Sequence, residues 1–273
     1  MATACIVDGT KAKRPFSKTT FAMHGFNVVT CPACELKYVD ISDDALSLIL
    51  KRYYEGAYDK RTSEKSTALS RFRKSVASIT GMDLAISESQ ARFMERSGLI
   101  QSNNIIDLGC GQGKLLIFLE RRGYEVGGVE PDPERARVGQ QQLKRDVVKI
   151  GTIDNPENYD VDVIIISHVL EHLTRPDKFL RLLKKRNPEA KLFVEVPNCA
   201  NPEGLKASMS EPHNYHFNAR NLKALLENCG WKVKRTETCA ANGYYWAHIL
   251  WFLLRKDVCP RKENGFLLRL MAE

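Results

Sequence analysis

From residue 105 onward, short apolar segments alternate with longer amphipathic segments along the chain. The apolar segments are typical of strands, and the amphipathic segments are typical of helices. This alternation predicts a mainly parallel sheet that is covered by helices on both faces. No helical segment separates the last two predicted strands, so we expect the final strand to run antiparallel. The predicted strands are residues 105–108, 125–130, 147–150, 161–167, 191–196, 231–238 and 249–256, and the predicted helices are 87–96, 114–122, 133–145, 176–185 and 218–230. The fold class is therefore α/β, a doubly wound sheet of seven strands.

A glycine-rich turn, Gly109-Cys110-Gly111-Gln112-Gly113, joins the first of these strands to its helix. Glycines at alternate positions let the backbone turn tightly and approach a ligand without a Cβ in the way. A dinucleotide fingerprint would need Gly or Ala at Lys114, and a Walker loop would need Gly at Leu108 and Ser or Thr at Leu115. What remains is an acidic residue, Asp107, followed by G-x-G-x-G, which is the pattern of loops that bind S-adenosylmethionine.

The second predicted strand ends in Glu130. A carboxylate at this place can accept hydrogen bonds from both hydroxyl groups of a ribose. A glycine loop with a following acid also occurs in dinucleotide sites, but the loop spacing above argues against that reading. Loop and acid together indicate a site for the methyl donor.

The chain resembles the class I S-adenosylmethionine-dependent methyltransferases over about residues 85–256. The motifs that carry this resemblance are Ile105–Gly113, Gly128–Asp132, Ser167–Leu173, Phe193–Asn198 and His213–Asn218. The resemblance implies a Rossmann-like sheet of seven strands with an antiparallel last strand, in agreement with the pattern of elements.

The resemblance also implies which residues hold the cofactor. Asp107 and the glycine loop would flank the methionine part, Glu130 would bind the ribose, and Pro131 would lie near the adenine. The edge of the adenine and the methionyl side would be completed by residues after the third and fourth strands. The implied cofactor-binding residues are Asp107, Gly109, Cys110, Gly111, Gly113, Glu130, Pro131, Thr152, Ile153, Asp154, Ser167 and His168.

Histidines are the candidate catalytic residues. Methyl transfer from a sulfonium is an in-line displacement, and a hydroxyl acceptor benefits from a general base with a pKa near neutral. His172 follows the fourth strand, whereas His213 and His216 lie in a loop over 197–218 that is long enough to act as a lid or a substrate wall. We predict His216 as the base or substrate hydrogen-bonding group, with His213 and His172 as the other candidates. Helix-start and exposed-loop histidines are the alternatives.

Cysteines near the N-terminus form one half of a zinc knuckle, Cys31-Pro32-Ala33-Cys34. Upstream, Cys5 and Asp8 have the same spacing, with a carboxylate where a second thiol is expected. Zinc accepts carboxylate ligands, so Cys5, Asp8, Cys31 and Cys34 could close a structural zinc site, with His24 as a rival fourth ligand. Some methyltransferases of the family that the chain resembles carry such an N-terminal ribbon. A metal-free ribbon is the alternative.

We expect four segments along the chain. These are a zinc-ribbon-like and helical cap segment over 1–60, a linker or cap helix over 61–86, the methyltransferase domain over 87–258, and a C-terminal tail over 259–273. No stretch has the length and apolarity of a membrane span or a signal peptide, and eight cysteines without such a signal indicate reduced thiols or metal ligands. We therefore expect a cytoplasmic protein.

The predicted function is methyl transfer from S-adenosylmethionine to a small-molecule or saccharide-like acceptor, at a hydroxyl oxygen. The alternatives are an RNA methyltransferase and a catalytically silent cofactor-binding or scaffold module. The net charge of +8 is spread over the chain, and no stripe of aromatic and basic residues indicates nucleic acid as a partner. No pattern in the sequence predicts an oligomeric state.

Overall fold

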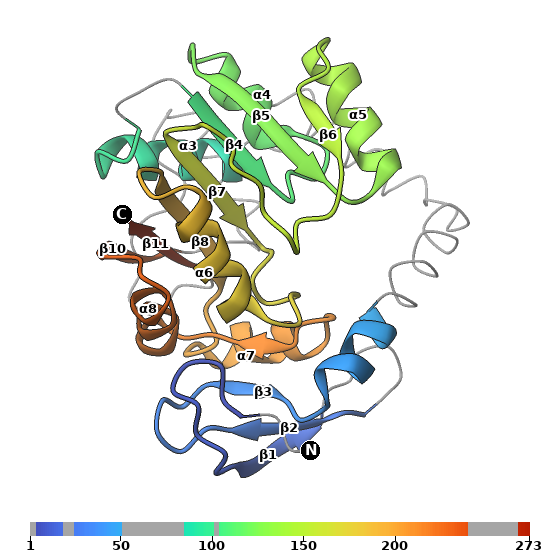
Figure 1. Ribbon diagram of the computed structural model, residues 1–273, viewed down its shortest axis with the longest axis vertical. Coiled ribbons are helices and arrows are strands. Elements are labelled where there is room, and N and C mark those ends of the chain that lie inside the picture. The colour runs from blue at the N-terminus through green and yellow to red at the C-terminus, as the bar shows by residue number, and fades with distance from the viewer. Residues whose placement is uncertain (1–3, 19–24, 51–84, 101–103, 240–266) are drawn as a thin grey trace.

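The structure, a computed structural model, describes residues 4–18, 25–50, 85–100, 104–239 and 267–273. Figure 1 shows a large sheet with helices on both sides and, below it, a small sheet built mainly from N-terminal residues. Within the described residues, no helix combines the length and apolarity needed to cross a bilayer.

The large sheet has seven strands in the order β10-β11-β8-β7-β4-β5-β6. Strands β4 to β8 are parallel, and β11 is antiparallel to both of its neighbours. The strands are β4 (Asn104–Leu108), β5 (Glu125–Glu130), β6 (Val148–Ile150), β7 (Val163–Ser167), β8 (Lys191–Pro197), β10 (Val233–Cys239) and β11 (Leu267–Ala272). The chain order reverses between β4 and β7, and the carboxyl ends of strands at such a point form the usual ligand crevice of an α/β sheet.

Helices cover both faces of this sheet because its central strands are apolar on both faces. On β7, Val163 and Ile165 pack with the helices of one face, whereas Ile164 and Ile166 pack with those of the other. The first face carries α3 (Ala85–Arg96), α4 (Lys114–Glu120) and α5 (Pro133–Leu143), and the second carries α6 (Pro176–Arg186) and α8 (Ala219–Asn228). The predicted seven-stranded α/β fold is confirmed, and the bounds of its predicted elements agree to within two residues wherever a described element corresponds.

Two predicted helix starts show the expected capping. The Asp132 carboxylate accepts hydrogen bonds from the amides of Glu134 and Arg135 at the start of α5, and Pro133 occupies the first turn. Asn218 and Asn221 form a reciprocal capping box at the start of α8. These local signals fix where the helices begin, independently of the packing.

The C-terminal end of the chain requires a correction. The predicted last strand, residues 249–256, lies outside the described residues. The antiparallel strand of the described sheet is instead β11, within the 259–273 segment that was predicted to be a tail. All six residues of β11 are buried between β8 and β10, so the end of the chain belongs to the sheet.

The small sheet joins the N-terminal segment to the large domain. Its order is β1-β2-β3-β9, with β1 (Arg14–Lys18), β2 (Asn27–Thr30) and β3 (Lys37–Val39) from the N-terminus. Its last strand, β9 (Tyr215–His216), comes from the long loop after β8, which also contains α7 (Pro202–Met209). Lys37 pairs with His216, and Tyr38 pairs with Tyr215. The long loop that carries the predicted catalytic residues His213 and His216 therefore supplies one edge strand, β9, of this small sheet. The predicted linker, 61–86, lies almost wholly outside the described residues.

Candidate functional site

The glycine loop after β4 has the backbone that only glycine adopts readily. Gly109, Gly111 and Gly113 all have positive φ, and Gly109 at +84° is the most constrained of the three. A Cβ on Gly109 would lie 2.5 Å from the Val169 Cγ2. The Gly109 amide donates to the carbonyl of Val129 at 2.7 Å, which holds the loop against β5. The close approach of Val169 and the positive φ thus require glycine at 109.

Glu130, at the end of β5, also holds this loop in place through a hydrogen bond. Its buried carboxylate accepts a hydrogen bond from the Gly111 amide at 2.7 Å and one from the Asp132 amide at 3.0 Å. Burial raises the pKa of Glu130 by more than these amide hydrogen bonds lower it. Each oxygen keeps a further lone pair, so the carboxylate can accept additional hydrogen bonds from a ligand.

A cleft of about 390 Å³ opens at the carboxyl ends of β4 and β7, within the size range of small-molecule sites. Its lining residues are Gln90, Asp107, Gly109, Cys110, Gly111, Gln112, Lys114, Leu115, Arg135 and Ser167. Five residues predicted to hold the cofactor are among them, namely Asp107, Gly109, Cys110, Gly111 and Ser167.

The other predicted cofactor residues do not line this cleft. Gly113 caps α4, and Glu130 holds the loop from behind. Pro131 is exposed after β5, and Ile153 is packed in the core. Thr152, Ile153 and Asp154 follow β6, on the far side of β5, so a role of these residues at the adenine stays a prediction.

Asp107 is the buried acid of the cleft. Its Oδ1 has no hydrogen-bond partner within the described part of the chain. Burial raises the pKa of Asp107 to about 7, and the neighbouring charges of Glu130 and Glu195 add to this effect. A buried carboxylate that lacks a counter-charge is costly unless a cationic ligand supplies one. Asp107 is therefore suited to face a positively charged group of a ligand.

A buried ion-pair network supports two walls of the cleft. Arg269 on β11 and Glu195 on β8 are 1% and 0% exposed, and the Arg269 Nε donates to the Glu195 Oε2. Arg269 also donates through Nη1 to the Ser89 hydroxyl at 2.8 Å. The other Glu195 oxygen accepts from the Gln90 Nε2 at 2.6 Å and from the Ser167 hydroxyl at 3.2 Å. Since Gln90 and Ser167 line the cleft, the network sets their orientation.

His168 extends this network toward the surface. It has a left-handed backbone (φ 55°), which is unusual for a residue other than glycine and is often found at functional sites. Its imidazole lies 3.6 Å from Glu195 and 3.3 Å from Glu171. Desolvation lowers the pKa of His168, but these two carboxylates outweigh it and raise the pKa to about 10. The His168 side chain is 44% exposed, so a cationic imidazole faces solvent beside Ser167.

The three predicted catalytic histidines lie close to one another in the structure. The Ser208 hydroxyl lies 2.8 Å from the His213 Nδ1 and 2.9 Å from the His216 Nδ1, and so bridges the two rings. The rings of His172 and His213 meet edge to face, with centroids 4.6 Å apart. Burial lowers the pKa of His213 to about 4 and that of His216 to about 3. The described lining of the cleft includes none of these histidines.

Sequence reasoning missed several residues of this site. Gln90 and Ser89 belong to a polar run at the start of α3, which reads as a solvated helix turn although the fold buries it. Arg269 lay in the predicted tail. Ser208 had no signal beyond its position in the long loop. Their roles depend on partners far away in the chain, which no local pattern encodes.

The N-terminal cysteines form two knuckles of the same construction. In the first knuckle, the Cys5 amide donates to the Thr10 carbonyl and the Gly9 amide donates to the Cys5 carbonyl. In the second, the Cys31 amide donates to the Leu36 carbonyl and the Glu35 amide donates to the Cys31 carbonyl. All four distances are 2.9 Å. Gly9 and Glu35, which follow the two knuckles, both have positive φ. The Thr10 amide donates to the Asp8 carboxylate, and the Leu36 amide hydrogen-bonds Cys34 in the same relative position. Asp8 therefore occupies the place of the second cysteine.

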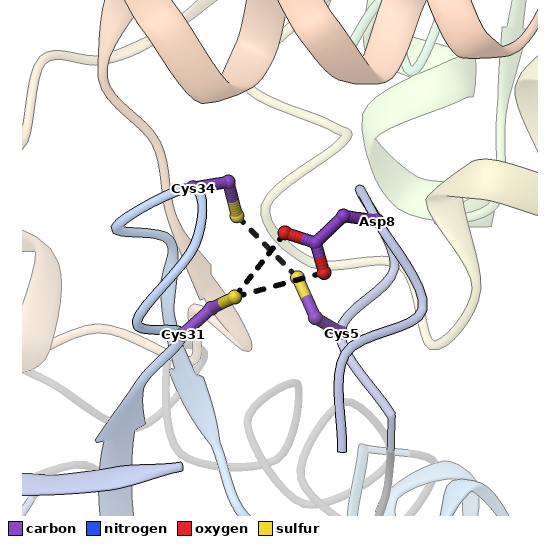
Figure 2. A group of neighbouring side chains, drawn as sticks. All are labelled: Cys5, Asp8, Cys31 and Cys34. Atoms are coloured by element: carbon purple, nitrogen blue, oxygen red, sulfur yellow. Dashed lines mark hydrogen bonds between the residues drawn. The ribbon is translucent and has the colours of Figure 1, made fainter. Parts of the chain in front are cut away.

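Figure 2 shows that the four side chains of these knuckles point toward one another. Their ligand atoms all lie within 4.8 Å of each other. The Sγ atoms of Cys5 and Cys34 are 3.5 Å apart, and the Cys31 Sγ lies 3.3 Å from the nearer Asp8 oxygen. Three thiols and one carboxylate in this arrangement are a donor set that suits tetrahedral zinc. His24, the rival fourth ligand, lies outside the described residues.

The fold and the glycine-loop cleft define a class I S-adenosylmethionine-dependent methyltransferase. Residues 69–236, more than half of the chain, match the family described as methyltransferase domain. The chain belongs to this family.

Solved structures with a similar fold include a methyltransferase from Thermotoga maritima described as a possible histamine N-methyltransferase. It is 14% identical with a TM-score of 0.52, and the match covers 73% of this chain and 94% of that one. A second is magnesium protoporphyrin IX methyltransferase from Synechocystis with bound SAH, 14% identical with a TM-score of 0.51, covering 83% and 98%. At such identities the likeness concerns the fold.

Curated relatives match a shorter stretch of the sequence. The mitochondrial ubiquinone biosynthesis O-methyltransferase of Schizosaccharomyces pombe is 29% identical over 115 residues, which are 38% of this chain and 41% of that protein. A ubiquinone biosynthesis O-methyltransferase of Yersinia pestis is 30% identical over 98 residues, 33% of this chain and 40% of its own length. The chain thus spans about two fifths of the length of these curated relatives.

Proposed function

We propose that this protein transfers the methyl group of S-adenosylmethionine to a hydroxyl oxygen of a small-molecule or saccharide-like acceptor. The observation that carries the proposal is the buried carboxylate of Asp107 in the wall of the cleft, beside a glycine loop fastened by Glu130. The sulfonium and ammonium groups of this cofactor are cations, and the buried Asp107 Oδ1 has no hydrogen-bond partner among the described residues, so it is free to face such a group. The names of the curated O-methyltransferases support oxygen as the acceptor atom.

The chain's own residues account for binding and orientation of the donor. When bound, S-adenosylmethionine supplies an already activated methyl group. Gly109 packs directly against Val169 and so fixes the loop that lines the cleft, and the network from Arg269 through Glu195 holds Gln90 and Ser167 in its wall. Rigid walls matter because alignment of nucleophile and methyl group is the main catalytic demand of an in-line displacement.

The acceptor side is assigned to the segment after β7 and to the loop before β9. His168 lies beside Ser167 with its imidazole partly exposed, where it can hydrogen-bond an acceptor hydroxyl and hold its oxygen in line. The proton that the hydroxyl loses on methylation would pass to water at this exposed edge. His216 is buried and shares the Ser208 hydroxyl with His213. We therefore assign to His216 the predicted hydrogen-bonding role, in which it orients the acceptor loop or the acceptor itself.

The proposal is tested with the full chain, labelled S-adenosylmethionine and a panel of saccharides, other hydroxyl-bearing small molecules and total RNA. We expect label on a small molecule, as an O-methyl group by NMR. His216→Ala should lower turnover about 10²-fold or more if His216 acts as the base, and normal turnover would remove this histidine from the mechanism. Lys206→Ala, an exposed change on α7, is the matched control and should retain normal turnover.

The two alternative functions give different results in the same assay. Label that appears only on RNA, is removed by ribonuclease and falls steeply with salt would show an RNA methyltransferase. Tight cofactor binding with no transfer to any acceptor would show a silent module. The cytoplasmic location also stays a prediction, since one curated relative is named as mitochondrial.

We also propose that the N-terminal knuckles hold a structural zinc ion through Cys5, Asp8, Cys31 and Cys34. The matched hydrogen bonds of the two knuckles and the convergence of the four ligand atoms support this. The ion would tie the knuckles together and so stabilise the sheet that ends in β9. Cys31→Ser should release zinc and weaken the pairing of β3 with β9, measured by metal analysis and hydrogen exchange.

A further inference from the structure

A second group of metal-ligating side chains lies in the large domain, apart from the N-terminal knuckles. Glu171 and His172 come from the segment after β7, and His213 comes from the loop before β9. One ligand atom from each of the three residues lies within 4.8 Å of the other two. We call these three residues the carboxylate–imidazole cluster. Two segments some forty residues apart in the chain thus meet at one point.

The Glu171 carboxylate is the first reason to expect a cation here. The residue is 1% exposed, and neither of its oxygens receives a hydrogen bond from a residue that the structure describes. His168 lies 3.3 Å from one oxygen as an ion-pair partner, but that imidazole is itself 44% exposed and is shared with Glu195. A fully buried carboxylate normally has its lone pairs satisfied by several donors or by a metal ion.

The two imidazoles are held as metal ligands usually are. The His172 Nδ1 lies 3.0 Å from the carbonyl oxygen of Pro212, which can only accept, so the ring carries its proton on Nδ1 and its lone pair on Nε2. The His213 Nδ1 lies 2.8 Å from the Ser208 hydroxyl. Ligating histidines generally engage their other nitrogen in this way, which fixes the tautomer and the orientation of the ring. In both rings this contact is made by Nδ1.

We propose that Glu171, His172 and His213 bind a divalent transition-metal cation. Two imidazoles and one carboxylate favour a borderline cation such as zinc or cobalt(II) over magnesium or calcium, which prefer all-oxygen sites. The ion links the segment after β7 to the loop that leads into β9, and it neutralises the buried charge of Glu171. The site does not depend on which acceptor the enzyme methylates.

Cobalt(II) is the probe that separates this site from the knuckles. The full-length protein is stripped with a chelator, loaded with cobalt(II), and examined by metal analysis and absorption spectroscopy. An ion bound at the cysteines gives intense thiolate charge-transfer bands, whereas one bound by imidazole and carboxylate gives only weak visible bands. We expect one ion of the second kind per chain, and we expect it to persist in Cys31→Ser.

Variants assign the ligands. Glu171→Gln and His213→Ala should each lose the ion without thiolate bands, whereas His216→Asn, a change of a buried histidine in the same loop, should keep it. Binding of S-adenosylmethionine to each variant shows that its fold is intact, and it is a separate readout from the methyl-transfer assay. If the wild-type protein binds no ion other than the thiolate-bound one, or if Glu171→Gln keeps the second ion, the proposal is wrong and His168 alone balances Glu171.

Discussion

Arg269 and Glu195 face each other directly across the antiparallel pair of β11 and β8. Both side chains are almost completely buried, and Glu195 also accepts hydrogen bonds from two residues of the cleft wall. Burial raises the pKa of Glu195, but Arg269 and His168 lower it by more, to about 2, so the carboxylate is ionised. The end of the chain thus supplies the counter-charge beneath the cofactor cleft.

Loss of this counter-charge should destabilise the protein strongly. Arg269→Met leaves Glu195 buried and without its main partner, and removal of one member of a buried pair costs about 3–5 kcal/mol. Lys234→Met is the matched control, since Lys234 pairs with Glu273 at the surface, where an ion pair contributes little to stability. Urea unfolding measures both variants. Equal losses of stability would contradict the role assigned to Arg269.

Glu130 should contribute to cofactor affinity. Glu130→Ala removes the acceptor of the Gly111 and Asp132 amides together with the predicted ribose ligand. We expect S-adenosylmethionine binding to weaken by roughly 1–3 kcal/mol, the range for stranded polar partners. Glu134→Ala, an exposed change one helix turn away, is the control for titration calorimetry. Unchanged affinity in Glu130→Ala would mean that the ribose lies elsewhere.

Gly109 should tolerate no side chain. Gly109→Ala places a methyl group 2.5 Å from the Val169 Cγ2 and also forces alanine into the left-handed region. Gly123→Ala has the same backbone conformation, with φ +89°, but open space around the Cβ, and so isolates the backbone cost of roughly 1–2 kcal/mol. We expect Gly109→Ala to lose a further 1–3 kcal/mol or so through overpacking and to bind the cofactor poorly. Similar behaviour of the two variants would show that Val169 moves freely.

Asp107 should make the stability of the cofactor-free protein depend on pH. Its pKa is about 7 in the folded state and about 3.9 in an unfolded chain, so the folded state favours the protonated form. The stabilising effect of that proton is complete below about pH 4 and is lost as the pH rises to about 7. Asp107→Asn cannot ionise, so its stability relative to wild type should increase over this range and then level off. A constant difference in unfolding free energy from pH 4 to 8 would contradict the assigned burial.

Part of this architecture could be predicted because it is encoded locally. The β-branched run of β7 predicts a strand buried on both faces, and Asp132-Pro133 and Asn218 mark helix starts through their own hydrogen bonds. The spacing of Cys5, Asp8, Cys31 and Cys34 likewise predicts that two knuckles converge, because each knuckle is a local turn.

The rest depends on contacts between distant segments. Arg269 can pair with Glu195 only because β11 lies between β8 and β10. In the sequence, β11 follows a long segment whose apolar run, 249–256, is the stronger candidate for the last strand. Gln90 reads as part of a solvated helix turn until α3 packs over the ends of β7 and β8. The bridge from His213 through Ser208 to His216 could not be predicted, since the fold of the long loop decides which side chains meet.

Titration calorimetry of the full-length protein with S-adenosylmethionine, with a nicotinamide dinucleotide as the competing ligand, tests the central claim most directly. We expect one molecule of S-adenosylmethionine bound per chain, weakened in Glu130→Ala and lost in Gly109→Ala, and no binding of the dinucleotide. Absence of S-adenosylmethionine binding to the folded wild-type protein, or preferential binding of the dinucleotide, would contradict the assignment of the cleft.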